Sequence, residues 1–414
     1  MKIAYIHQYY QTPMSNGGTR SYEFARRLVE HGHEVNMITS DPEAPVTGER
    51  WRTTVEGGVT VHRASVPYAN SMAYGDRLKA FFRFSALAAR RAGQLDQDIV
   101  FATSTPLTVA IPGAYSAWRH NVPLVLEVRD LWPATPIAVG ALRSPLTRRV
   151  ALALEAWAYR RAEHVVALSP DMADGITGRF PETHVSVIPN GCDLDVFGCV
   201  GDRGTKLRAT TPWLGGNPLV VYAGAIGRVN GVGYLVKMAA ACRAVAPSVR
   251  FAVIGVGREL PAVHKLAEEL GVLGANLFLL DAMSKRDVAA WFAACDLAVS
   301  TVIDIPELSA NSANKVFDGW AAGRPVAVNH RGWLADVIAD SGAGLVLPPV
   351  DTRRAAELLS EFLNDRARVT ASRVAATNLA RGRFSRDRLA AQCEEILVDV
   401  ARTRQQGTDL VMTV

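Results

Sequence analysis

The chain has 414 residues, of which 49% are hydrophobic and 7% aromatic, as in globular proteins long enough for two domains with full cores. A net charge of +5 is too small for this length to indicate a nucleic-acid-binding protein. Five cysteines without CxxC spacing argue against a disulfide framework or a zinc site, and for a reducing compartment.

The first residues, Met1 to His7, enter a strand-like run and lack the longer apolar core of a signal peptide. No uninterrupted apolar segment reaches the roughly 18 residues that a membrane-spanning helix needs. We therefore expect a cytoplasmic protein whose membrane contact, if it has one, is peripheral at the inner face of the plasma membrane.

Short apolar runs alternate with helical patterns along the whole chain. Several runs lack polar alternation, as parallel strands buried on both faces do. In the first half we predict strands at Lys2–Gln8, Glu34–Thr39, Val59–Ala64, Asp98–Ser104, Pro123–Val128, His164–Ser169 and Val185–Pro189. In the second half we predict them at Pro218–Ala223, Arg250–Gly255, Asn276–Leu280, Leu297–Ser300, Pro325–Val328 and Gly344–Leu347. This βαβ rhythm predicts an α/β protein with two doubly wound, Rossmann-like parallel sheets.

Residues 199–217 interrupt this rhythm because they are rich in Gly, Thr and charge and have no periodicity. We predict an N-terminal domain over residues 1–198, a linker over 199–217 and a C-terminal domain over 218–385. A last helix within residues 386–414 is expected to pack back on the N-terminal domain. Two such domains facing each other form a cleft lined by the carboxyl ends of both sheets, where ligands bind.

The first strand-to-helix loop ends with Gly17 and Gly18, directly before a helix predicted over Thr19–Glu30. Adjacent glycines at a helix start let the backbone approach a ligand closely, although the motif is not GxGxxG. Arg20 lies in the first turn, where a cation is unfavourable to the helix dipole. It is therefore a candidate for contacting an anion or an acceptor group. The alternative is a plain flexible loop.

Residues 76–92 combine apolar and basic side chains at helical spacing. One face would carry Leu78, Phe81, Phe82, Ser85 and Ala89. Such helices bind anionic membranes or lipid-linked molecules. The alternative is a helix packed on its own sheet with its basic residues in solvent.

Two further segments of the second half predict a phosphate-binding site. Arg228 follows a buried strand and a glycine turn, and arginine binds phosphate bidentately. Later, a polar loop from Ser309 to Asn314 runs into a short helix that ends at Gly323. A helix N-terminus with Lys315 is suited to an anion, and Asp318 one turn later is suited to accept hydrogen bonds from a diol. Phosphate plus ribose is the expected ligand, and an ordinary junction with an Asn N-cap is the alternative.

The order of these motifs resembles the retaining GT-B glycosyltransferases, specifically their large fourth family, over nearly the whole chain. The resemblance rests on Gly17-Gly18, Arg129-Asp130-Leu-Trp-Pro133, Val187-Ile-Pro-Asn-Gly-Cys-Asp193, Gly227-Arg228, Gly255-Val-Gly257, Ala294 through Ser300, and Asp318 through Pro325. Val-Arg-Asp-Leu-Trp-Pro and Asn-Ser-x-Asn-Lys are similar to a bacterial subgroup. This subgroup includes N-acetyl-L-fucosamine transferases of polysaccharide assembly.

The resemblance implies an N-terminal acceptor-binding domain and a C-terminal nucleotide-sugar-binding domain. Asp318 stands where the family has its ribose-binding glutamate, but Ala310 stands where the family has a second glutamate that contacts the donor sugar. Arg228 matches the phosphate-binding arginine, whereas Gly233 replaces its companion lysine. We expect Lys315 to supply that missing charge.

Other donor contacts implied by the resemblance are made by the main chain. The N–H groups of Asn311, Ser312 and Ala313 would hold the sugar, while Gly227 and Gly257 approach the nucleotide and Met283 meets its base.

In the N-terminal domain, Arg129 would contact phosphate or acceptor, and Asp130 would orient sugar or acceptor. Asp130 as the N-cap of the next segment is the alternative.

The implied reaction is metal-independent transfer with retention, in which the leaving diphosphate takes the proton of the acceptor hydroxyl. No cofactor is expected beyond the co-substrate, a UDP-sugar and by preference a UDP-N-acetylhexosamine. The acceptor would be a glycan or a lipid-linked intermediate. A small natural product such as an aminocyclitol or nucleoside is the alternative, since an Ala- and Arg-rich composition suggests a GC-rich bacterial genome. A non-catalytic nucleotide-sugar-binding subunit is the alternative from another class, because Ala310 replaces a carboxylate.

Overall fold

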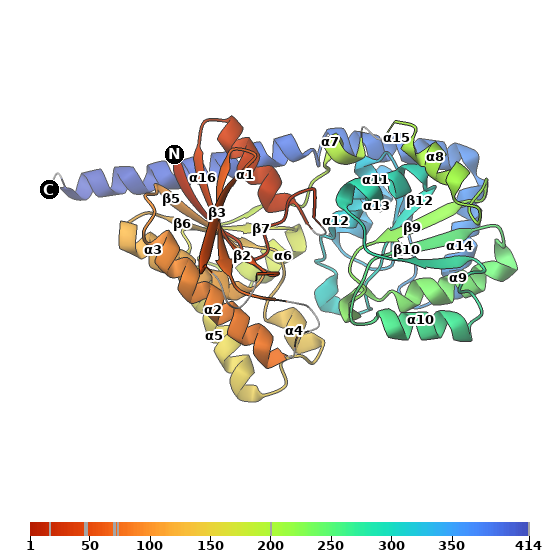
Figure 1. The fold of residues 1–414 in the computed structure, drawn as a ribbon, viewed down its shortest axis with the longest axis horizontal. Helices are drawn as coiled ribbons and strands as arrows, with labels where there is room; N and C mark the ends of the chain where they lie inside the picture. The colour runs from red at the N-terminus through yellow and green to blue at the C-terminus, as the bar shows by residue number, and fades with distance from the viewer. Residues whose placement is uncertain (16–17, 45–48, 69–71, 73, 199–200, 413–414) are drawn as a thin grey trace. The chain divides into compact units, whose positions relative to one another are not determined.

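The computed structural model describes residues 1–15, 18–44, 49–68, 72, 74–198 and 201–412 (Figure 1). The chain divides into two compact units. The first comprises Met1–Gln11, Thr19–Pro189 and Leu389–Val414, and the second comprises Thr12–Gly18 and Asn190–Arg388. Apart from the short segment Thr12–Gly18, the chain therefore enters the second unit after Pro189 and returns to the first after Arg388.

The first unit contains an eight-stranded sheet with the order β3-β4-β2-β1-β5-β6-β7-β8. Neighbouring strands run parallel except β3, which pairs antiparallel with β4. The strands are β1 (Lys2–Ile6), β2 (Glu34–Asp41), β3 (Trp51–Glu56), β4 (Val59–Ser65), β5 (Ile99–Thr103), β6 (Leu124–Val128), β7 (His164–Ala167) and β8 (Val185–Val187). The seven predicted strands are confirmed with small shifts at their ends. β3 has no predicted counterpart, because this edge strand has no fully buried residue and lacks an apolar run.

Helices from both ends of the chain complete the core of the first unit. Its helices are α1 (Arg20–Glu30), α2 (Tyr74–Ala92), α3 (Ala110–His120), α4 (Ala134–Ala138), α5 (Pro145–Arg161), α6 (Pro170–Thr177) and α16 (Arg386–Met412). Phe24 and Leu28 of α1 join Leu389, Cys393 and Leu397 of α16 in one apolar cluster with β1, β2, β4 and β5. The C-terminal helix is thus part of the core of the first unit (Figure 1).

The second unit contains a six-stranded, fully parallel sheet with the order β11-β10-β9-β12-β13-β14. Its strands are β9 (Leu219–Ala223), β10 (Arg250–Ile254), β11 (Leu277–Leu280), β12 (Leu297–Ser300), β13 (Val326–Val328) and β14 (Gly344–Val346). All six predicted strands of this half are confirmed. The strands are largely apolar because helices cover both faces of the sheet.

Two apolar clusters lie on the two faces of this sheet. α9 (Gly233–Val245), α10 (Leu260–Glu269) and α14 (Thr352–Asn364) cover one face. The other face is covered by α7 (Leu194–Phe197), α11 (Lys285–Ala294), α12 (Asn314–Ala321), α13 (Trp333–Ser341) and α15 (Arg366–Arg381). This is the doubly wound arrangement that the sequence predicts.

The predicted linker over residues 199–217 is not a segment without structure. It belongs to the second unit and contains α8 (Arg203–Thr210). A Cβ atom on Gly204 would lie 2.6 Å from the carbonyl carbon of Ala293, so α8 packs backbone to backbone on the end of α11. Because this contact is made through a glycine, α8 has no apolar stripe, and its sequence shows no helical periodicity.

Candidate functional site

Most of the predicted site residues of the second unit lie on loops at one edge of its sheet. Because parallel strands end at the same edge, the loops after β9, β10, β11 and β12 are neighbours there. These loops carry Arg228, Gly257, Met283 and the segment Ser309–Ala313. α12 starts directly after that segment, so Lys315 and Asp318 enter the same region.

The turn that carries Arg228 is fixed by hydrogen bonds from neighbouring residues. The short helix η2 (Arg228–Asn230) follows Gly227, whose N–H donates to Asn230 Oδ1 over 3.2 Å. Thr301, just after β12, donates from Oγ1 to the Asn230 carbonyl over 2.7 Å. The Arg228 side chain itself is exposed. A rigid turn thus presents an accessible guanidinium at the sheet edge.

Lys315 lies against the loop that leads to Arg228. Its Nζ is 4.5 Å from the centroid of the Tyr222 ring and 3.4 Å from Tyr222 Oη. A Cβ on Gly224 would lie 2.9 Å from Lys315 Cε, so this glycine makes room for the lysine. Burial lowers the pKa of Lys315 to about 8, although Asp318 partly offsets it. Two cations therefore flank one loop of the second unit.

The loop before α12 is held from two sides. Asn190 Nδ2 donates to the Ser312 carbonyl over 2.5 Å, and Trp333 Nε1 donates to the Asn311 carbonyl over 3.0 Å. The N-cap of α12 is Ala313, and no side chain caps this end. The predicted alternative, an asparagine N-cap, is therefore wrong. Because no side chain caps it, the N-terminus of α12 is suited to an anion.

Asp318 belongs to a buried cluster of charged side chains. Its Oδ1 lies 3.4 Å from Lys285 Nζ, and Lys285 also pairs with Asp193. Arg386 Nε donates to Asp193 Oδ1 over 2.7 Å. Only 13% of the Asp318 side chain is exposed. Burial raises the pKa of Asp318 to about 6, although Lys285 acts in the opposite direction.

Lys285 is the main charged residue at this edge that is absent from the predicted site. It occupies the first turn of α11, after the N-cap Ser284. A cation there is unfavourable to the helix dipole, which is the same signal that singled out Arg20. A cation in the first turn of a predicted helix would therefore also have indicated Lys285. Only the fold shows that Asp193, 92 residues earlier, is its partner.

The glycines of Gly255-Val-Gly257 are explained by packing within the protein. A Cβ on Gly257 would lie 2.2 Å from the Ile226 carbonyl oxygen, and one on Gly255 would lie 2.0 Å from the Gly224 oxygen. The loops after β9 and β10 thus stack backbone on backbone. Met283 is half-buried against the apolar cluster that includes α11 and α12.

In the first unit, Arg20 has a different role from the predicted one. It is fully buried, and its Nε and Nη2 donate to Glu127 Oε1 over 2.9 and 2.8 Å. It also donates to the carbonyl oxygens of Ile188 and Pro189. Burial raises the pKa of Glu127, but the charges of Arg20 and Arg129 and the hydrogen bonds from Arg20 and Thr103 together hold it below its ordinary value. The prediction that Arg20 contacts an acceptor is therefore corrected: a buried carboxylate on β6 compensates its charge.

Arg129 and Asp130 follow β6 at the carboxyl edge of the first sheet. The Arg129 N–H donates to Ser104 Oγ over 3.0 Å, and its guanidinium is 3.4 Å from Nε2 of the buried His7. Burial and the Arg129 charge lower the pKa of His7 well below its ordinary value, so the imidazole is neutral. Asp130 is exposed and accepts from Thr105 Oγ1 over 3.3 Å. Gly17 lies outside the described residues, and Gly18 resumes the described chain.

The described residues include no group of three or more His, Cys, Asp or Glu side chains placed to hold a metal ion. Cys192, Cys242, Cys295 and Cys393 are buried free thiols, while Cys199 lies outside the described ranges.

Comparison with known proteins assigns a domain family to each half of the chain. Residues 17–191 match the family model of the Glycosyl transferase 4-like domain, and residues 217–365 match that of Glycosyl transferases group 1. The first range contains every strand of the first sheet except β1, and the second contains all six strands of the second sheet. The fold is therefore the GT-B fold, as the resemblance implies.

Individual relatives are distant but match along most of the chain. The chain is 27% identical over 353 residues to a D-inositol 3-phosphate glycosyltransferase of Nocardiopsis dassonvillei, which covers 80% of this chain and 78% of that protein. It is 24% identical to a 2-deoxystreptamine N-acetyl-D-glucosaminyltransferase of Streptomyces fradiae, over 63% of this chain and 62% of that protein. Anabaena HepE, solved with UDP and glucose, superposes with a TM-score of 0.71 at 19% identity, covering 96% of this chain and 100% of HepE.

The buried Arg20–Glu127 pair generates a prediction about stability. We expect Glu127→Ala to lower the free energy of unfolding by about 3–5 kcal/mol, because it leaves the buried Arg20 charge without a partner. The double variant Arg20→Met/Glu127→Leu should be less destabilised than the single one. Urea unfolding followed by circular dichroism measures both.

The exposed Lys2–Asp96 ion pair supplies the control for this measurement. Asp96→Ala should leave the unfolding midpoint nearly unchanged. If Glu127→Ala behaved like Asp96→Ala, the buried pair would not hold the first unit together.

Proposed function

We propose that this chain, a GT-B glycosyltransferase that uses a nucleotide-sugar donor, transfers its sugar to an acceptor hydroxyl with retention and without a metal ion. The observation that carries the proposal is the position of Lys315 against the loop that presents Arg228. Gly233 stands where relatives in the resembled family have a lysine, and Lys315 brings a cation to the same loop from α12.

The two cations would act on the leaving group. Cleavage of the bond between the anomeric carbon and the diphosphate develops negative charge on the diphosphate. Arg228, Lys315 and the uncapped N-terminus of α12 would stabilise that charge. The leaving phosphate would then take the proton of the attacking hydroxyl, so no protein nucleophile is required. Asp130 of the first unit would orient the sugar or the acceptor.

Asp318 would accept hydrogen bonds from the ribose hydroxyls, with Lys285 holding its carboxylate in place. The main chain of Asn311 to Ala313 would hold the donor sugar, since Ala310 is buried and brings no carboxylate. We favour UDP-N-acetylhexosamine as donor. Support comes from the name of the Streptomyces relative, an N-acetyl-D-glucosaminyltransferase, and from the UDP bound to Anabaena HepE.

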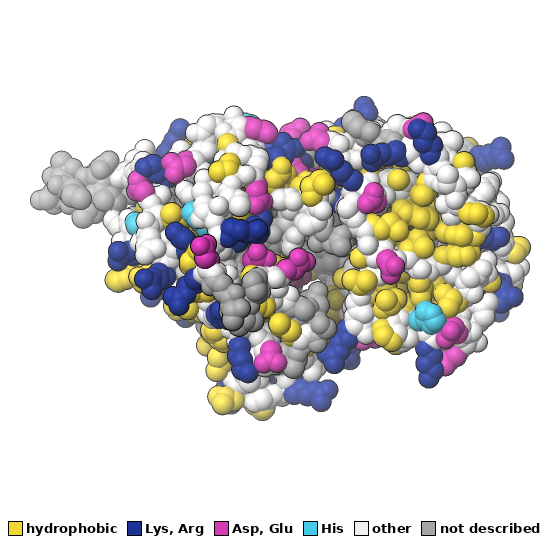
Figure 2. Space-filling view, viewed as in Figure 1, with side chains coloured by type: hydrophobic (Ala, Val, Ile, Leu, Met, Phe, Trp, Pro, Cys, Tyr) yellow, Lys and Arg dark blue, Asp and Glu magenta, His cyan; other side chains and the backbone are white. Residues whose placement is uncertain are grey.

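Exposed apolar residues on three helices of the first unit favour a lipid-linked acceptor. These residues are Phe82 of α2 (55% exposed), Trp118 of α3 (76%), and Leu146 (70%) and Val150 (62%) of α5. α3 contacts both α2 and α5, and each of the three helices carries at least one exposed arginine. Figure 2 shows hydrophobic and basic side chains together on the visible face of the first unit. Apolar aromatic residues among cations suit an anionic membrane surface. No helix in the described part of the chain is long and apolar enough to cross a membrane.

The apolar face predicted for residues 76–92 is not the exposed one. Ser85 is buried and donates to the Thr108 carbonyl over 3.0 Å, and Phe84 and Ala88 are fully buried. The alternative, a helix packed on its own sheet, therefore describes most of α2. Phe82 alone of the predicted face is exposed.

A cyclitol acceptor is the second candidate. The two relatives named above are, by their names, transferases acting on inositol 3-phosphate and on 2-deoxystreptamine, which are both cyclitols. A panel of UDP-sugars assayed against inositol phosphate, 2-deoxystreptamine and undecaprenyl-diphosphate sugars would identify the acceptor. Failure of every donor to be hydrolysed or transferred would instead indicate a non-catalytic binding subunit.

Lys315 and Arg228 should both contribute to donor binding. We expect Arg228→Ala and Lys315→Ala each to weaken UDP-sugar binding by about tenfold or more, because each removes a cation from the diphosphate. Isothermal titration calorimetry measures the Kd. Lys237→Ala, in the same unit but on α9, is the control. Unchanged affinity in Lys315→Ala with lost affinity in Arg228→Ala would disprove the compensation by Lys315.

The two shifted pKa values predict a bell-shaped pH profile for kcat/KM of the donor, which reports the free enzyme. Asp318 becomes neutral as the pH falls below about 6 and then accepts ribose hydrogen bonds poorly. Lys315 loses its charge as the pH rises above about 8. Asp318→Asn should flatten the acid limb, and Lys315→Arg should move the alkaline limb upward. Retention of both limbs in both variants would assign them to other groups.

Membrane binding is tested by flotation with phosphatidylglycerol vesicles. Trp118→Ser and Phe82→Ser should reduce the bound fraction several-fold, and Arg90→Glu should reduce it more at low than at high salt. Val350→Ser replaces an equally exposed apolar residue of the second unit and serves as control. Arg91 is left unchanged because its guanidinium packs over Trp51. Equal flotation of all variants would end the membrane proposal.

A further inference from the structure

The second unit has a basic pocket at the amino-terminal edge of its sheet. The pocket has a volume of about 480 Å³ and is lined by segments that precede β9, β12 and β13, together with α8 and the start of α15. Arg228 and Ser309–Ala313 follow strands of the same sheet and therefore belong to the opposite edge. The pocket lies entirely within the second unit and is separate from the candidate donor site.

Four arginines and one carboxylate line this pocket: Arg208, Arg324, Arg366, Arg373 and Asp296. The Asp296 carboxylate is already satisfied within the protein. Its Oδ2 accepts from Arg208 over 2.8 Å and from the Leu219 N–H over 3.0 Å, and its Oδ1 accepts from Arg373 over 3.0 Å. One negative charge thus faces four positive ones.

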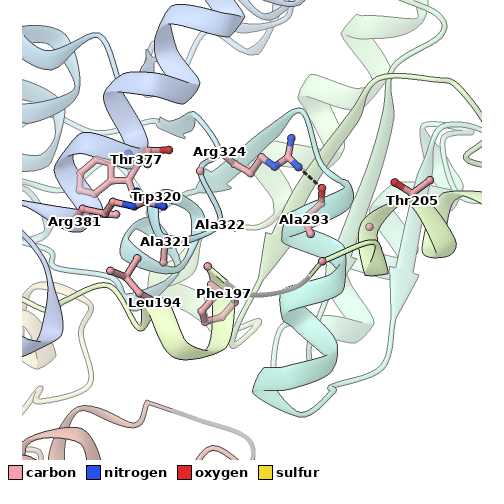
Figure 3. A pocket seen from close by; sticks show the side chains of 15 residues that line it. Leu194, Phe197, Thr205, Ala293, Trp320, Ala321, Ala322, Arg324, Thr377 and Arg381 are labelled. Carbon is pink, nitrogen blue, oxygen red and sulfur yellow. Dashed lines mark hydrogen bonds between the residues drawn. The ribbon is translucent and has the colours of Figure 1, made fainter.

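Part of this positive charge has a structural role. Arg208 Nε donates to the Ala294 carbonyl over 2.9 Å. Arg324 donates to the Ala293 carbonyl, as Figure 3 shows. These two carbonyls end α11, where cations stabilise the helix dipole. Arg208 is therefore largely occupied, whereas Arg324 uses only one nitrogen in this contact.

The remaining guanidinium groups have unused donors. Arg324 Nε and Arg373 Nε are buried atoms without a hydrogen-bond partner among the described residues. A buried donor without an acceptor is costly, and proteins rarely leave it unpaired. Arg366 is exposed and adds a further cation at the pocket. Burial lowers the pKa of Arg324, and Arg373 and Arg208 add to this shift by charge repulsion.

We propose that this pocket binds a small anion carrying one or two phosphate groups, held by Arg324, Arg366 and Arg373. Arginine pairs bidentately with phosphate, and such an anion would offset the excess positive charge of the pocket. The volume fits pyrophosphate or a sugar phosphate, since small-molecule pockets begin at roughly 300 Å³. The site goes beyond the proposed transfer reaction and does not depend on it.

The experiment separates this site from the donor site. Inorganic pyrophosphate is titrated calorimetrically into Arg228→Gln/Lys315→Gln, in which the donor site is disabled. We expect one molecule to bind per chain. Adding Arg366→Glu should raise the Kd about tenfold or more, because an exposed cation becomes an anion beside the ligand. Glucose 1-phosphate is titrated in parallel. Whichever compound has the lower Kd shows whether the pocket prefers an organic phosphate or inorganic pyrophosphate.

Arg353→Glu is the matched control, since Arg353 is also an exposed arginine near the start of its helix, α14, and lies outside the pocket. It should leave the Kd unchanged within about twofold, consistent with weak long-range effects of exposed charges. Melting temperatures without anion verify that each variant is folded. The proposal is overturned if neither phosphate compound binds the donor-site variant, or if Arg366→Glu and Arg353→Glu change the Kd equally.

Discussion

The buried carboxylate of Asp193 is the contact on which the second unit depends. Lys285 and Arg386 both pair with it, and these three side chains are at least nine-tenths buried. Burial alone would raise the pKa of Asp193, but Arg386 and Lys285 hold it well below the ordinary range. A carboxylate in this position is stable only while both cations remain, because an unpaired buried charge costs several kcal/mol.

This carboxylate also fastens together the two segments through which the chain enters and leaves the second unit. The Cys192 N–H donates to the Phe384 carbonyl over 2.8 Å, and Arg386 donates to the Gly191 carbonyl over 2.8 Å. Through Lys285, the same cluster reaches Asp318 on α12. The residue proposed to bind ribose is therefore connected to both crossing segments by a continuous set of ion pairs.

Each unit has a buried cation in the first turn of a helix and compensates its charge in the same way. Arg20 starts α1 and Lys285 starts α11, and each cation at a helix N-terminus is neutralised by a carboxylate distant in sequence. The sequence reveals the unusual cation but not its partner, because the partner is chosen by the fold. For this reason the sequence predicts a ligand contact for Arg20, and Lys285 is absent from the predicted site.

The parallel sheets and their order of elements could be predicted because strands buried on both faces carry continuous apolar runs. β3 and α8 could not, since one is a polar edge strand and the other packs through Gly204. The loop with Arg228 and the start of α12 with Lys315 and Asp318 lie at the same sheet edge, because both follow parallel strands of one sheet. Their side-chain environments could not be predicted, because ion pairs and close backbone contacts leave no periodic signal.

The position of α16 has a consequence for how the protein is made. Leu389, Cys393 and Leu397 belong to the core of the first unit, yet they follow the whole second unit in the sequence. Residues 190–388 are all synthesised before them. N-terminal domains usually fold first during translation. The first unit cannot complete its core in this way, because residues 190–388 are synthesised before the part of α16 that covers its apolar face.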